Sequence, residues 1–259
     1  MKPHEKLTKK IRKPIFSLTK SIHDKRGLQN LRKNQHLYRT LTQYLELSQS
    51  TGCSYYDYWT LYRHIRKNKP VEILECGTGV STIVMAWALM ENEREGDPAG
   101  RITSMEDIDI WYQKAAKLVP EQLKPYIELI HSPKVEYSYS IFRGVGYQEI
   151  PQRAYEFVFV DGPETTAPSD GTMAFDFDLI NVVKNADHPV SAIVDKRVTT
   201  CYVYQKVFGT DKVEFDPRCD LCFVGPLTKK NLKSRIGGGR FAHTFRLWGN
   251  SELNFIMKS

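Results

Sequence analysis

Glycines and acidic side chains follow an apolar run in the segment Glu75-Cys76-Gly77-Thr78-Gly79. The two glycines permit a tight turn and a close approach of the backbone to a ligand, and Ser81 can cap a helix that begins there. The third glycine of a complete G-x-G-x-x-G pattern is absent, because position 82 is Thr. Glu75 would also repel a phosphate. The segment therefore favours a ligand that carries a cation or hydroxyls, and an ordinary glycine turn is the alternative.

A second acidic point, Glu106-Asp107, ends the apolar run 101–107 and comes 29 residues after Gly77. An acid at the end of the second strand of a nucleotide-binding sheet can accept hydrogen bonds from both hydroxyls of a ribose. Glu106 is the stronger candidate for this contact because it ends the strand. Asp107 and Asp109 could instead cap the next helix. The pattern predicts a ribose site at Glu106, with a solvated acidic turn as the alternative.

Two further aspartates, Asp161 and Asp195, end the apolar runs in FVFVDGPE and IVDKR. Ligands of an open α/β sheet bind beyond the carboxyl ends of the strands, so both positions are candidates for contact with a substrate. Asp161 could take a proton from a substrate hydroxyl, or it could only cap the turn at Gly162-Pro163. Lys196 follows Asp195 directly, and it could polarise a hydroxyl or hold a carboxylate.

The cysteines do not indicate a disulfide framework. Their number is odd and the chain of 259 residues is not small. Cys219-x-x-Cys222 has half of a zinc-site spacing, but a second pair or a His-x-x-x-His partner is missing. The favoured interpretation is a set of free thiols in a reduced cytoplasmic protein. The five cysteines are Cys53, Cys76, Cys201, Cys219 and Cys222.

The elements that must position these side chains alternate between strand and helix after residue 70. The predicted strands are 71–77, 101–107, 126–132, 155–162, 189–195, 212–216 and 221–225. The predicted helices are 80–90, 108–119, 138–153, 175–185 and 199–208. Such alternation predicts an α/β fold with a Rossmann-like, doubly wound, seven-stranded sheet in a three-layer αβα sandwich. The sheet would be mostly parallel, with an antiparallel last strand formed by the final hairpin.

Charge divides the chain into an acidic body between two basic ends. Residues 1–40 carry a net charge of +10, residues 41–227 carry −9, and residues 228–259 carry +6. We predict a basic helical extension over 1–54, the Rossmann-like domain over 55–227 and a basic tail over 228–259. The ends could bind nucleic acid through its phosphates or an anionic membrane surface, could form homodimer contacts, or could simply be solvated.

Composition and hydropathy exclude several classes of protein. The chain is 41% apolar and 26% charged, which is typical of a globular protein and not of a disordered or fibrous one. The longest apolar run, 83–90, is far shorter than the roughly 18 residues of a membrane span. The basic N-terminus has no apolar core of a secretory signal. We therefore expect a cytoplasmic location.

The three carboxyl-end motifs together resemble class I S-adenosylmethionine-dependent methyltransferases. These motifs are Glu75-x-Gly77-x-Gly79, Glu106, and Asp161-Gly162-Pro163, and the final hairpin is similar to that family's antiparallel last strand. The resemblance covers about residues 55–226. It implies S-adenosylmethionine as the cofactor. The residues implied at the cofactor are Glu75, Gly77, Gly79, Ser81, Glu106, Asp107, Ser132 and Asp161, with Ser132 or His131 near the adenine.

Within that superfamily the body is most similar to small-molecule O-methyltransferases, which implies methylation of an oxygen on a small molecule or a sugar. Metal-dependent members bind Mg²⁺ through acids that correspond to Asp161 and Asp195, and the metal lowers the pKa of the substrate hydroxyl. Those members usually have Asp or Asn after the second acid, whereas this chain has Lys196. The resemblance thus implies Asp161, Asp195 and Lys196 at the acceptor, and Mg²⁺ stays open.

Two rival functions are also compatible with the sequence. An aminopropyltransferase on the same scaffold would need several acids along a polyamine groove, and Asp161, Glu164 and Asp170 could supply some of them. A scaffold protein without catalysis could keep the fold and use its basic ends on nucleic acid or membrane. Methylation of a base amino group is disfavoured, because Glu164 stands where a stacking aromatic residue would be expected. A nicotinamide enzyme is disfavoured by the missing third glycine.

Overall fold

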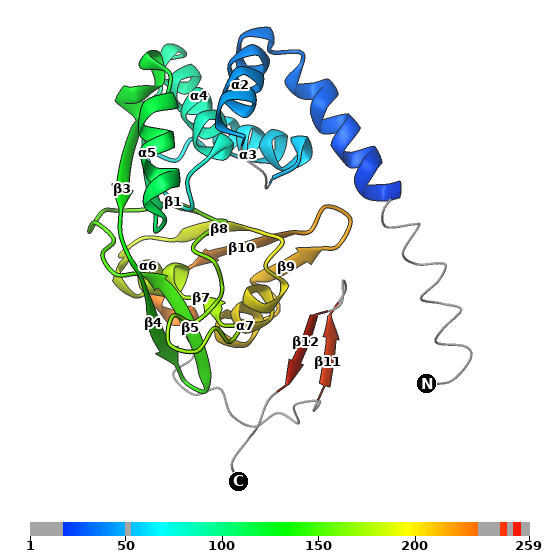
Figure 1. Ribbon diagram of the computed structural model, residues 1–259, viewed down its shortest axis with the longest axis vertical. Helices are drawn as coiled ribbons and strands as arrows, with labels where there is room; N and C mark the ends of the chain where they lie inside the picture. The colour runs from blue at the N-terminus through cyan, green and yellow to red at the C-terminus, as the bar shows by residue number, and fades with distance from the viewer. Residues whose placement is uncertain (1–17, 50–52, 233–243, 248–250, 255–259) are drawn as a thin grey trace.

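The computed structural model describes residues 18–49, 53–232, 244–247 and 251–254. Its main sheet has seven strands in the order β3-β2-β1-β6-β8-β10-β9 (Figure 1). The sheet is parallel except that β10 runs antiparallel to both of its neighbours. Its strands are β1 (Glu72–Cys76), β2 (Arg101–Glu106), β3 (Ile127–His131), β6 (Phe157–Val160), β8 (Val190–Asp195), β9 (Val213–Asp216) and β10 (Leu221–Leu227). The predicted fold class is confirmed, including the antiparallel last strand.

Helices cover both faces of this sheet, and alternate side chains of the central strands serve the two faces. In β6, Phe157 and Phe159 join the core under α2, α3 and α4, whereas Val158 and Val160 join the core under α6 and α7. A period of two is the consequence of the pleat, which points successive side chains to opposite faces. The helices are α2 (Gln35–Ser48), α3 (Tyr55–Asn68), α4 (Val80–Arg94), α5 (Asp109–Leu118), α6 (Asp178–Asn185) and α7 (Val198–Phe208).

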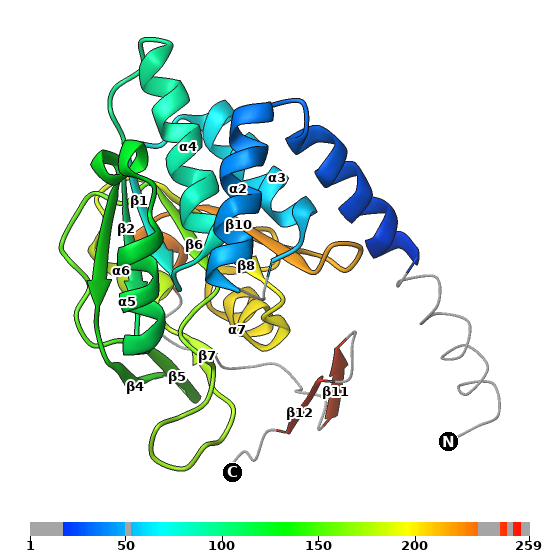
Figure 2. The ribbon, with the colours of Figure 1, turned by 45° about the horizontal axis from the view of Figure 1, so that its top comes forward.

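The N-terminal helices pack on the body. A helix over residues 18–31 precedes α2; Figure 2 shows it beside α3, and α2 lies next to α4. Leu31, Leu37 and Leu41 are fully buried in the same core as α4. A Cβ on Gly27 would lie 2.5 Å from the Cα of Tyr56, so this glycine permits the first helix to approach α3 closely. The boundary predicted at residue 54 stays a prediction. The basic segments 1–17 and 233–243 lie outside the described residues.

The helix predicted over 138–153 is wrong. This region contains a hairpin of β4 (Lys134–Tyr139) and β5 (Phe142–Tyr147), joined to β7 (Phe175–Asp176) in a second sheet. Gly144 and Gly146 lower the helical propensity of the segment. They also leave room for neighbours, since a Cβ on Gly146 would lie 2.3 Å from Oδ1 of Asp178. The hairpin is favoured because other strands pack against it. These contacts come from distant segments, so the sequence pattern of the hairpin itself does not indicate them.

None of the helices in the described part of the chain is long and apolar enough to cross a membrane.

The remaining elements are short. The shorter elements are the 3₁₀ turns η1 (Glu121–Tyr126) and η2 (Lys229–Asn231) and the antiparallel pair β11 (Thr244–Leu247) and β12 (Ser251–Asn254).

Candidate functional site

A pocket of about 370 Å³ lies at the carboxyl ends of β1, β2 and β6, where the sheet topology predicts a ligand site. The strand order places β2 and β6 on either side of β1, so the three loops that follow them meet. Of the predicted cofactor residues, the structure brings six to the wall of this pocket. These residues are Gly77, Gly79, Ser81, Glu106, Asp107 and Asp161.

The glycine loop that follows β1 leaves free space in the pocket. Gly77 has φ +96°, which favours glycine, and a Cβ there would lie 3.1 Å from the backbone carbon of Asp161. Gly162 forms the other side of this close contact, because a Cβ on Gly162 would lie 2.7 Å from the Cα of Gly77. In contrast, a Cβ on Gly79 would meet nothing within 4 Å. Gly77 and Gly162 thus fix the contact between two loops, and Gly79 leaves free space in the pocket.

Glu75 lies beneath this loop and does not line the pocket. It is fully buried and accepts hydrogen bonds from Ser81 (2.6 Å), Thr82 (2.6 Å) and Ser104 (2.7 Å). Burial raises the pKa of Glu75 to about 7, and the three hydroxyl donors oppose this rise. The expectation that Ser81 caps the helix is wrong, since Gly79 is the N-cap and the Ser81 hydroxyl points to Glu75. Glu75 therefore positions the loop.

Glu106 presents a nearly buried carboxylate at the pocket wall. It is 7% exposed and accepts hydrogen bonds from the backbone N–H of Ile108 (3.0 Å) and, more weakly, of Thr78 (3.4 Å). A carboxylate has more acceptor sites than these two donors use, so oxygen lone pairs remain for a diol. Asp107 also lines the pocket, and the expectation that it caps α5 is wrong because this helix has no side-chain cap.

An apolar surface adjoins these acids, and the sequence patterns did not single it out. Ile108 and Trp111 both line the pocket, and their side chains are 44% and 41% exposed. A flat aromatic ring beside a carboxylate with free acceptor sites suits a nucleoside. His131 packs against Tyr112 with ring centroids 5.4 Å apart. Ser132 is 2% exposed, accepts a hydrogen bond from the Glu149 N–H and does not line the pocket.

The other end of the pocket carries Asp161, Cys53, Tyr58 and Arg197. Burial raises the pKa of Asp161, and the charge of Arg197 opposes the rise. The Cys53 thiol donates to Oδ2 of Asp161 at 3.5 Å. Arg197 donates to the carbonyl of Pro163 (2.7 Å) and to the buried Asp176 (2.8 Å), so it ties the loop after β6 to β7. Arg197 is part of the IVDKR motif, but only its neighbours were singled out.

Asp195 and Lys196 lie behind this end of the pocket and do not line it. The Lys196 ammonium is 3.5 Å from Oδ2 of Asp195 and 3.9 Å from Oδ2 of Asp57. Lys196 instead lines a neighbouring pocket with Lys20 and Arg218. Burial raises the pKa of Asp195 to about 6, and the charge of Asp161 adds to this effect. Asp57 was missed in the sequence because its spacing after Ser54 is simply that of a capping box.

The donor set does not fit Mg²⁺ held by Asp161 and Asp195. Among the described residues, the ligand atoms that cluster are those of Cys53, Asp57 and Asp195, and Asp161 is outside this group. Mg²⁺ requires oxygen ligands, whereas here a thiol and the Lys196 ammonium stand beside Asp195.

A nucleoside cofactor, in contrast, fits the residues present. The pocket combines the free space at Gly79, the buried acceptor Glu106 and the apolar side chains of Ile108 and Trp111. S-adenosylmethionine has a ribose diol, an adenine ring and a cationic sulfonium. Glu106 can accept hydrogen bonds from the diol, and Ile108 and Trp111 can contact the adenine. The charge of Asp161 can attract the sulfonium. The cofactor would supply an activated methyl group.

Comparisons with known proteins place this arrangement in a fold family. No protein-family model and no curated protein matches the chain. Among solved structures, a Staphylococcus aureus protein provisionally described as a caffeoyl-CoA O-methyltransferase matches 78% of this chain and 98% of its own. The TM-score is 0.52 and the identity is 14%. An O-methyltransferase from Bacillus cereus in complex with S-adenosylhomocysteine matches 70% of this chain and 74% of its own, with a TM-score of 0.44 and 17% identity.

Likeness at this level of identity shows the fold. The seven-stranded sheet with one antiparallel strand and the pocket at its carboxyl edge agree with it. The chain has the fold of the class I S-adenosylmethionine-dependent methyltransferases.

Proposed function

We propose that the protein transfers the methyl group of S-adenosylmethionine to an oxygen of a small molecule or sugar. The observation that carries this proposal is the pocket itself, which combines the open glycine loop with the buried Glu106 carboxylate at the switch point of the sheet. Gly77 and Gly79 would face the methionine end. Glu106 would accept from the ribose hydroxyls, and Ile108 and Trp111 would contact the adenine.

The acceptor would bind near Asp161, at the end of the pocket away from Trp111. S-adenosylmethionine would supply an activated methyl group to the acceptor oxygen, and the electron pair of its carbon–sulfur bond would stay on sulfur. The carboxylate of Asp161 takes the hydroxyl proton. The raised pKa of Asp161, caused by burial, makes this carboxylate a stronger base than an exposed one. Asp195 and Lys196 would act from behind Asp161 by setting its charge environment. Alignment of the two reactants would supply most of the rate.

The first test is calorimetric titration of the protein with S-adenosylhomocysteine. We expect micromolar binding by the unmodified chain. Glu106→Gln should weaken the binding by roughly 10-fold or more, because a neutral amide accepts less strongly from a diol than a carboxylate does. Glu149→Gln is the matched control, since it makes the same substitution at an exposed acid outside the pocket. Folded protein that binds no S-adenosylhomocysteine would contradict the cofactor assignment.

The second test separates the chemistry from cofactor binding. Asp161→Asn should abolish methyl transfer to a hydroxyl acceptor while S-adenosylhomocysteine still binds. Turnover that survives this change would show that Asp161 is not the base. Aminopropyl transfer from decarboxylated S-adenosylmethionine, in place of methyl transfer, would support the rival function on the same scaffold.

A further inference from the structure

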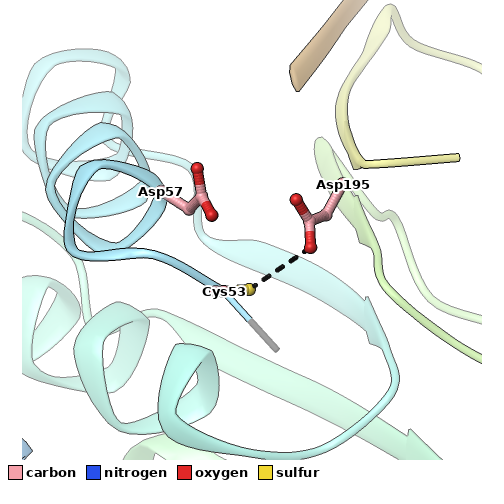
Figure 3. Close-up of side chains that lie close together, drawn as sticks. All are labelled: Cys53, Asp57 and Asp195. Carbon is pink, nitrogen blue, oxygen red and sulfur yellow. Dashed lines mark hydrogen bonds between the residues drawn. The ribbon is translucent and has the colours of Figure 1, made fainter. Parts of the chain in front are cut away.

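The side chains of Cys53, Asp57 and Asp195 converge on one another (Figure 3), and Cys53 also lines the pocket beside Asp161. Their ligand atoms all lie within 4.8 Å of one another. Cys53 and Asp57 flank the start of α3, whereas Asp195 ends β8, so the cluster joins parts of the chain that are 142 residues apart. We propose that these three residues bind one thiophilic divalent cation, of which Zn²⁺ is the prime example. This site goes beyond the proposed methyl transfer.

Two buried oxygen atoms in the cluster have no hydrogen-bond partner. Asp57 is 0% exposed and Asp195 is 2% exposed, and Oδ1 of each is unpaired in the described structure. Figure 3 shows the two carboxylates pointing toward one another across the gap above Cys53. Buried charges in proteins are normally paired or coordinated to a metal. A cation between these carboxylates would supply the missing partner, and this observation is independent of the clustering itself.

Lys196 does not fill this role. Its ammonium lies 3.5 Å and 3.9 Å from the two Oδ2 atoms, and it leaves both Oδ1 atoms without a partner. The side chain is 43% exposed and also borders the neighbouring pocket, so it can withdraw toward solvent. Lys196 and a metal ion are therefore competing cations. Removal of the lysine charge should strengthen metal binding.

The ligand types select the class of metal. A thiolate ligand favours Zn²⁺ and related transition metals over Mg²⁺ and Ca²⁺. With Zn–S and Zn–O bonds of about 2.3 and 2.1 Å, tetrahedral geometry separates S from O by about 3.6 Å. The distance from Cys53 Sγ to Asp195 Oδ2 is 3.7 Å. Three protein ligands leave a fourth position open. Because Cys53 itself lines the cofactor pocket, the open position is near the pocket.

The test uses the full chain, freed of metal by dialysis against a chelator and then titrated with Co²⁺ as a spectroscopic probe. We expect one equivalent to produce the near-ultraviolet charge-transfer band of a cobalt–thiolate bond, and Zn²⁺ to displace the cobalt. Cys53→Ser should abolish the band. Cys219→Ser is the matched control, because Cys219 is a buried free thiol outside the cluster, and the band should persist in this variant.

Substitutions of the other groups sharpen the test. Asp195→Asn should weaken Zn²⁺ binding by more than about 100-fold, because loss of an outer-sphere partner alone costs roughly 10–100-fold. Lys196→Met should strengthen it. Circular dichroism shows that each variant is folded, and it does not measure the metal. A band that survives in Cys53→Ser, or no saturable band in the unmodified chain, would overturn the proposal and leave the proposed function untouched.

Discussion

Glu75 is a buried acid whose charge state should make the stability of the protein depend on pH. Its carboxylate is 0% exposed beneath the glycine loop, and the hydroxyls of Ser81, Thr82 and Ser104 donate to it. Two effects compete at this site. Burial disfavours the charged form, whereas three hydroxyl donors favour it. The net result is a pKa raised from 4.5 to about 7, so burial is the larger effect.

The raised pKa fixes the direction of the pH effect. Between pH 4.5 and about 7 the folded state keeps the proton of Glu75 and the unfolded state has lost it. The free energy of unfolding therefore falls as pH rises through this window. One pKa unit corresponds to about 1.4 kcal/mol, so the loss amounts to about 3 kcal/mol at most. Glu75→Gln keeps the size and an acceptor oxygen but cannot ionise, and this contribution disappears.

The assay is urea unfolding of both proteins at several pH values from 4.5 to 7.5. The free energy of unfolding of Glu75→Gln minus that of the unmodified chain should rise by about 3 kcal/mol across this range. The difference cancels the titration of groups that the two proteins share. A difference that is flat with pH would show that burial and the hydroxyl donors balance. A difference that falls with pH would refute the reasoning, because it would mean that the hydroxyls stabilise the carboxylate more than burial destabilises it.

Three substitutions of glycine test the close packing around the pocket. Gly162→Ala should destabilise the protein by about 1–3 kcal/mol, since its Cβ would lie 2.7 Å from the backbone of Gly77; an unchanged urea midpoint would contradict this. Gly79→Ala has open space, so its unfolding free energy should change by less than about 0.5 kcal/mol, while S-adenosylhomocysteine binding weakens in calorimetry. Gly27→Ala places a Cβ 2.5 Å from Tyr56 and should expose the helix 18–31 to limited proteolysis.

The central sheet could be predicted because each of its strands is specified locally. All four residues of Phe157–Val160 are apolar, so both faces of this strand avoid water. A parallel strand covered by helices on both sides buries every residue of such a run. The residues at the carboxyl ends of these strands could then be predicted to share one site, because parallel strands end at the same edge of the sheet. Glu106 and Asp161 were located in this way, and both line the pocket.

The hairpin β4–β5 could not be predicted from its own residues. Gly144 and Gly146 give a weak local signal, and their conformation is decided by Phe175 and Asp178, which pack directly against them. Tyr147, at the end of this hairpin, therefore could not be assigned to the pocket that it lines.

By itself the sequence determined the layered α/β fold and the glycine and acid positions at the strand ends, because apolar runs and strand-end turns are properties of short segments. Only the tertiary structure decided which side chains from distant segments share a site. Asp57 looks like a helix cap in the sequence, and Cys53 looks like a stray thiol. Docking of α3 beside the end of β8 places them against Asp195. Contacts over 142 residues depend on how whole elements pack, and no local spacing records them.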